Sequence, residues 1–211
     1  MRVQKETRTV SSEFEVRAAA SGGSVLVGYA AKFGTRSQDL GGFVETIALG
    51  AFDRALQEQH DVRALFNHDP SLILGRSGAG TLRLFTDDVG LRYEVDLPDT
   101  SAGRDLAESL RRGDVAESSF SFRVLDQDWS LDADGRDLRT ITDLALYDVS
   151  PVTYPAYLDT SSALAARAAA AAAHQGEAIA RALHIARIGA ETDALHTTVL
   201  TTEEKVTNIV H

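Results

Sequence analysis

Seven short segments with the pattern of β-strands are spread over the first 150 residues, and they constrain the fold more than any other feature. Each favours β-branched or aromatic residues and is bounded by Gly, Asp, Asn or Pro. In Leu91–Leu97 apolar and polar residues alternate, as they do in a half-buried strand. The predicted strands are Val25–Ala30, Val62–Phe66, Thr81–Phe85, Leu91–Leu97, Ser119–Leu125, Leu138–Thr142 and Leu144–Val149.

Two segments between these strands have the pattern of α-helices. Ala51–Gln59 places apolar residues at helical spacing. A second helix is expected from Thr100 or Ser101 to Arg112, with a hydroxyl as N-cap and Gly113 as the stop. Short strands with inserted helices predict an α+β fold: a mainly antiparallel β-barrel of about seven strands with helices packed outside.

The composition changes near residue 160, where an Ala-rich run begins and Asp, Gly and Pro become rare. We therefore expect an N-terminal arm at 1–23, a barrel domain at 24–160, and an Ala-rich connector with a helical C-terminal tail at 161–211. The tail is interpreted either as a loosely docked appendage or as an assembly or targeting segment.

The chain carries 21 Lys and Arg against 31 Asp and Glu, a formal net charge of −10. A broad surface for nucleic acid or an anionic membrane is therefore not expected. The absence of Cys excludes disulfides, thiolate zinc sites and cysteine nucleophiles. No apolar run reaches the roughly 18 residues that a membrane span needs, and the N-terminus lacks the apolar core of a signal peptide. We expect a soluble cytoplasmic protein.

Three residues outside the tail have the side chains of a serine hydrolase. His68 follows an apolar strand in the turn Asn-His-Asp-Pro, where it can act as a general base or serve the turn alone. Ser119 lies in Ser-Ser-Phe-Ser-Phe, as a nucleophile or as a neutral filler on a strand face; neighbouring Ser118 would point to the opposite face. Asp148 lies within an apolar strand, where a carboxylate needs a partner unless it faces solvent. A serine nucleophile needs a base and a group that orients that base, although spacing alone cannot show that the three meet.

The chain resembles the maturation proteases of tailed-phage proheads, and through them the herpesvirus assembly protease. The matching stretches, in order, are GYAAKFGT from Gly28, GGFVETIALGAFDRAL from Gly41, LFNHDPSLILGRSGAGTLRL from Leu65, VGLRYEVDLPDTSAGRDLAESLRRGDVAESSFSFRV from Val89 and LYDVSPVTYPAYLDT from Leu146. Together they span roughly residues 25–160. The resemblance implies a serine endopeptidase with His68 as base, Ser119 as nucleophile and Asp148 as third member, with Asp143 in reserve.

The same resemblance implies the setting. Such an enzyme works inside the immature capsid in the host bacterial cytoplasm, cleaves coat or scaffold protein and then itself, and forms a homo-oligomer. It implies no cofactor and no metal. Backbone N–H groups around Thr153–Ala156, Pro155 excepted, are the candidates for binding the oxyanion. The competing hypothesis is a catalytically inactive, protease-like capsid scaffold or assembly factor.

Overall fold

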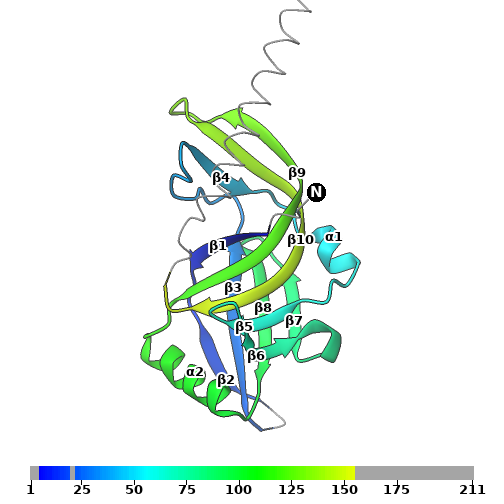
Figure 1. The fold of residues 1–211 in the computed structure, drawn as a ribbon, viewed down its shortest axis with the longest axis vertical. Coiled ribbons are helices and arrows are strands. Elements are labelled where there is room, and N and C mark those ends of the chain that lie inside the picture. Colours follow the sequence, from blue (N-terminus) through cyan, green and yellow to red (C-terminus); the bar gives the residue numbers. More distant parts are fainter. Residues whose placement is uncertain (1–4, 20–21, 155–211) are drawn as a thin grey trace, which may run out of the picture. The chain divides into compact units, whose positions relative to one another are not determined.

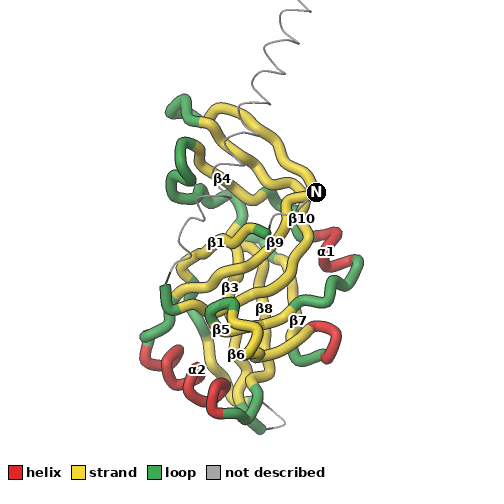
Figure 2. Tube along the Cα trace, in the orientation of Figure 1, coloured by secondary structure: helices red, strands yellow, loops and turns green. Residues whose placement is uncertain are grey.

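The computed structural model describes residues 5–19 and 22–154, which form ten strands, two α-helices and one short 3₁₀ helix (Figure 1). The strands are β1 (Glu6–Ser11), β2 (Glu15–Ala18), β3 (Ser24–Lys32), β4 (Phe43–Ile47), β5 (Arg63–Phe66), β6 (Asp69–Arg76), β7 (Leu82–Thr86), β8 (Gly90–Leu97), β9 (Glu117–Leu131) and β10 (Asp137–Val152). The helices are α1 (Asp53–Gln57), the 3₁₀ helix η1 (Ser77–Ala79) and α2 (Ser101–Arg112). Figure 2 shows α1 and α2 at the periphery of the strands.

The strands form two sheets. The six-stranded sheet has the order β1-β9-β10-β5-β6, and β4 also pairs with β10. The four-stranded sheet has the order β2-β3-β8-β7. All pairings are antiparallel except those of β10 with β4 and with β5, which are parallel.

The predicted fold class is wrong. In the described residues neither sheet closes: one ends at β1 and β6 and the other at β2 and β7, so there is no closed barrel. Strands predominate and only two short α-helices accompany them, which makes this part of the chain mainly β rather than α+β. The predicted helical tail at 161–211 lies outside the described residues.

The described residues form ten strands and not seven, because four strands were missed and two predicted strands are parts of β10. The missed strands are β1, β2, β4 and β6. β1 reads ETRTVS, with one apolar residue, and β6 opens with Asp-Pro, which is typical of a turn, before its short Leu-Ile-Leu run. Both β1 and β2 lie in the segment expected to be an N-terminal arm, and both are paired, β1 with β9 and β2 with β3.

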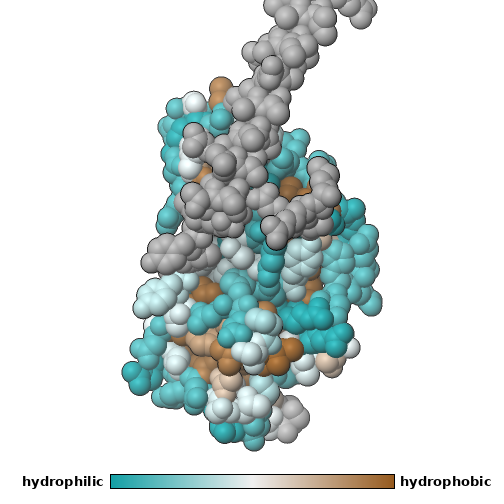
Figure 3. Space-filling model, in the orientation of Figure 1, coloured by the Kyte–Doolittle hydropathy of each residue, from teal (hydrophilic) through white to brown (hydrophobic). Residues whose placement is uncertain are grey.

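Side chains from both sheets and both α-helices build the main core. Tyr93 of β8 and Phe120 and Phe122 of β9 are fully buried in it. The Phe120 and Phe122 rings stack with centroids 4.8 Å apart, and Phe52 packs edge-on against Phe120 at 5.7 Å. On the surface, apolar side chains gather mainly in the lower half of the view, around β5 and β6 (Figure 3).

The second helix forms where its end signals predict it. The Thr100 side chain accepts a hydrogen bond from the backbone N–H of Gly103, and Gly113 ends α2 with a φ of 78°. Leu106 and Leu110 bury one face of this helix. The first helix, α1, is shorter than the predicted Ala51–Gln59.

The hairpin of β9 and β10 is the element that positions the candidate site. Two strands predicted separately, Leu138–Thr142 and Leu144–Val149, are parts of the single strand β10, with register irregularities between Ile141 and Leu144. The hairpin places Ser150 opposite Ser119 and Asp148 opposite Ser121. β5 then pairs with β10 at Asp148, which brings the turn after β5 to the same place.

Candidate active site

His68 is held in a two-residue turn between β5 and β6. Asn67 and His68 have φ values of 55° and 58°, and the flanking residues Phe66 and Asp69 pair with each other. Two successive positive φ values are typical of the type I′ hairpin turn, and Asn tolerates this conformation because its side chain bonds locally. In addition, the side-chain oxygen Oδ1 of Asn67 accepts hydrogen bonds from the Thr153 backbone N–H (2.9 Å) and hydroxyl (3.2 Å), which tie the turn to the end of β10.

Ser119 faces His68 and Ser118 does not. Ser119 Oγ lies 2.7 Å from His68 Nε2. On the opposite face of β9, Ser118 Oγ lies 3.1 Å from the Tyr93 hydroxyl in the core. Burial raises the pKa of the Tyr93 phenol, so this hydroxyl stays protonated. The alternation of side chains along a strand separates the two serines as the sequence predicts.

Asp148 contacts the other ring nitrogen of His68. Its Oδ1 is hydrogen-bonded to His68 Nδ1, and its Oδ2 accepts a hydrogen bond of 3.0 Å from Lys5 Nζ. Burial by itself would raise the pKa of Asp148, but the hydrogen bond and charge of His68, together with Lys5, hold it below its ordinary value. The carboxylate is therefore ionised at neutral pH, and it fixes the ring with its proton on Nδ1.

Two further serines surround the ring. Ser121 Oγ lies 3.1 Å from His68 Nδ1, and Ser150 Oγ lies 3.3 Å from Nδ1 and 3.3 Å from Asp148 Oδ1. The sequence interpretation did not single out these two residues or Lys5. A period of two is the signal that could have found the serines, since Ser121 follows Ser119 by two positions and Ser150 follows Asp148 by two.

The reserve residue Asp143 and the neighbouring carboxylate Asp69 lie elsewhere. Asp143 forms an ion pair with Arg54, with 2.6 Å between its Oδ2 and the guanidinium. Asp69, next to the histidine in sequence, accepts hydrogen bonds from Ser71. Neither carboxylate replaces Asp148 beside the ring.

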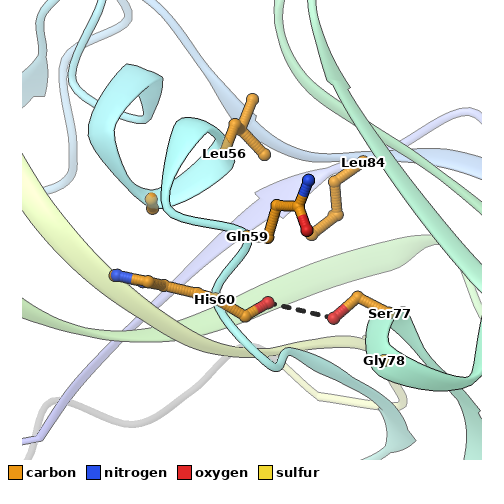
Figure 4. A pocket seen from close by; sticks show the side chains of 7 residues that line it. Leu56, Gln59, His60, Ser77, Gly78 and Leu84 are labelled. Atoms are coloured by element: carbon orange, nitrogen blue, oxygen red, sulfur yellow. Dashed lines mark hydrogen bonds between the residues drawn. The ribbon is translucent and has the colours of Figure 1, made fainter.

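His60 also lies apart from this group. It follows α1 and lines a hollow of about 250 Å³ with Leu56, Gln59, Ser77 and Leu84 (Figure 4). Its carbonyl oxygen accepts a hydrogen bond of 3.0 Å from Ser77 Oγ, and its ring contacts Glu58. His60 therefore does not contribute to the group around His68.

Ser119, His68 and Asp148 are arranged so that each can take a different part in the same reaction. With its proton on Nδ1, the imidazole has a free lone pair on Nε2, the atom that faces the Ser119 hydroxyl. A serine next to such a nitrogen can lose its proton as it attacks a carbonyl carbon, and the carboxylate stabilises the imidazolium that forms. The proposed oxyanion donors are not supported at Thr153, whose N–H is bonded to Asn67.

The sequence of this chain matches one known protein family. The model of the caudovirus prohead serine protease family matches residues 12–175. The chain belongs to this family. The resemblance to phage prohead proteases that the sequence motifs predict is thereby confirmed.

The fold of this prohead serine protease is also similar to that of a solved structure. The bacteriophage T4 capsid assembly protease, gp21, superposes with a TM-score of 0.50 at 12% sequence identity, over 72% of this chain and 98% of that one. At this identity the likeness concerns the fold alone. A comparison with curated protein sequences gives no match.

The described part of the prohead protease has neither a metal-binding cluster nor a membrane-spanning helix. Residues 5–19 and 22–154 hold no group of three or more His, Asp or Glu side chains that could bind a metal ion. Within the same ranges, neither helix is long and apolar enough to cross a membrane.

Proposed function

We propose that this prohead protease is a serine endopeptidase in which Ser119 is the nucleophile, His68 the general base and Asp148 the residue that orients the base. The observation that carries the proposal is the position of His68, with Ser119 Oγ on Nε2 and Asp148 on Nδ1. A nucleophile within hydrogen-bond reach of a base that is itself oriented by a third group is the signature of acyl transfer.

The reaction would proceed in two halves. Ser119 Oγ attacks the peptide carbonyl carbon while its proton moves to His68 Nε2, and the C–N bond of the resulting tetrahedral intermediate breaks as His68 returns that proton to the departing amine. Water then attacks the acyl-enzyme, His68 accepts a proton from the water, and Ser119 leaves with that proton. Asp148 stays ionised throughout and stabilises the imidazolium.

The family supports a role in capsid maturation. We infer that the substrates are coat or scaffold protein and the protease itself, and that cleavage takes place inside the immature capsid in the host bacterial cytoplasm. We also infer a homo-oligomer. No step of the proposed reaction requires a metal or cofactor.

Adjacent serines supply a matched test. The full chain is co-expressed with its coat protein, and intact masses are followed for wild type, Ser119→Ala and Ser118→Ala. Cleavage should disappear only in Ser119→Ala. If a folded Ser119→Ala chain still trims the coat protein at the wild-type rate, the nucleophile is wrong. If wild type and Ser118→Ala also leave the coat protein and themselves uncut, the inactive scaffold remains as the explanation.

A further inference from the structure

The N-terminal strand β1 lies directly along the candidate nucleophile. It pairs antiparallel with β9, so that Arg8 is opposite Phe120 and Thr9 is opposite Ser119. The carbonyl oxygen of Arg8 accepts a hydrogen bond of 2.9 Å from Ser119 Oγ, the same atom that contacts His68. A backbone segment of the chain itself therefore lies against the candidate nucleophile, where the backbone of a substrate would have to lie.

The way β1 binds is also the way an extended peptide binds to a sheet edge. β1 is the last strand of its sheet, so β9 would form the edge if β1 were displaced. Extended peptides add to such edges through main-chain hydrogen bonds, and pockets for alternate side chains provide specificity. The family match begins at residue 12, immediately after β1 ends.

Alternate side chains of β1 are held by buried opposite charges. Glu6 accepts hydrogen bonds from Arg139 at 2.9 and 3.1 Å. Arg8 donates to the two carboxylate oxygens of Glu45 at 2.7 and 2.9 Å. Arg139 and Glu45, which also contact each other at 2.9 Å, are buried and lie on β10 and β4.

A surface hollow lies next to Arg8. This hollow of about 300 Å³ adjoins β1, and Arg8, Glu45, Phe120 and residues 35–38 are among those that line it. Ser119 itself is fully buried beneath this arrangement, so a substrate cannot reach it while β1 is in place.

We propose that the edge of β9 beside Ser119 is the substrate-binding strand, and that β1 occupies it as an internal competitor. In a bound substrate, Arg139 would pair with an acidic side chain and Glu45 with a basic side chain two positions later. The basic residue would be the one whose carbonyl oxygen lies beside Ser119 Oγ, as Arg8 does in β1. The assignment of this edge to substrate rests on the proposed function. A tethered strand competes like a free peptide at on the order of millimolar concentration, so loosening β1 should make the edge available.

The test measures peptide binding rather than hydrolysis. All chains are full length and carry Ser119→Ala, and the probe is a dye-labelled peptide of residues 5–12, KETRTVSS, followed by fluorescence anisotropy. Glu6→Gln removes the charge that anchors β1, whereas Thr7→Gly weakens the strand without touching the ion pairs. Glu13→Gln is the matched control, because Glu13 is exposed in the same segment.

Both loosened variants should bind KETRTVSS at least tenfold more tightly than the Ser119→Ala parent, and Glu13→Gln should equal the parent. The isomeric peptide KRTETVSS, in which the two charges are exchanged, should bind at least tenfold more weakly to the loosened chains. Circular dichroism identifies a variant that does not fold, in which case the other one decides.

Equal affinity for the two peptides, or no gain in a folded loosened variant, would overturn the proposal. Because binding needs no chemistry, the two proposals fail separately. Peptide binding as expected with no cleavage by the Ser119-containing chain contradicts the proposed function alone, whereas cleavage without the expected binding contradicts the assignment of the β9 edge.

Discussion

Replacing Ser118 and Ser119 in turn should separate stability from activity. The two serines are adjacent and fully buried, and they differ in what their hydroxyls contact. Ser118 Oγ meets the Tyr93 hydroxyl inside the core, whereas Ser119 Oγ meets the partly exposed ring of His68 and a backbone carbonyl. Ser118→Ala should therefore mainly lower stability, and Ser119→Ala should mainly lower the rate of cleavage.

The expected magnitudes follow from these contacts. Ser118→Ala leaves the buried Tyr93 hydroxyl without its partner, which costs about 1–3 kcal/mol of unfolding free energy. In a domain of this size that lowers Tm by roughly 2–12 °C. Ser119→Ala should cost less, because the partly exposed His68 ring keeps its hydrogen bond to Asp148, but it should reduce cleavage by about 10⁴–10⁶. That loss corresponds to about 5–8 kcal/mol of transition-state stabilisation.

Urea unfolding followed by circular dichroism gives the stabilities, and mass spectrometry of the coat protein gives the cleavage rates. Tyr93→Phe is the internal check: combined with Ser118→Ala it removes both hydroxyls, so the double variant should be more stable than Ser118→Ala alone. The reasoning is refuted if Ser118→Ala abolishes cleavage while it remains folded, or if Ser119→Ala is the less stable of the two.

Three further changes probe the other parts of the site. Asp148→Asn should lower cleavage by about 10⁴, because an amide facing Nδ1 favours the wrong tautomer of His68; Asp143→Asn, which breaks an exposed ion pair, should stay within about tenfold of wild type in the same mass assay. Asn67→Ala should lower the urea-derived stability by about 1–2 kcal/mol, because Ala tolerates a positive φ poorly, and Asn67→Gly should lower it less; equal losses would contradict a conformational cause. The pKa values of Glu6 and Asp148 are lowered by folding, so the stability these carboxylates provide is present above their ordinary values of 4.5 and 3.8 and is lost as the pH falls below them. The urea midpoint of Glu6→Gln should therefore fall less between pH 6 and pH 3 than that of wild type. If the midpoints of both proteins fall by the same amount over this range, this role of Glu6 is contradicted.

Parts of the candidate site could be predicted because they depend on neighbouring residues. The turn that carries His68 is encoded by Asn67 and the residues around it, and strand alternation separates Ser119 from Ser118. The sequence also shows the three residue types of a serine hydrolase, at His68, Ser119 and Asp148. Lys5, Ser121 and Ser150 were missed, since nothing in their immediate sequence indicates that they surround an imidazole.

The sequence by itself determined the elements whose signals are local: the limits of α2, set by Thr100 and Gly113, and the strands with alternating or apolar runs. Only the tertiary structure decided that the sheets stay open, that the polar segment β1 is a strand, and that His68 meets residues 51 and 80 positions away. The physical reason is that a helix satisfies its backbone hydrogen bonds within a few residues, whereas a strand satisfies them with a partner that can lie anywhere in the chain. Buried charges at Arg139 and Glu45 hold β1 against β9, and the sequence of β1 carries no sign of either partner.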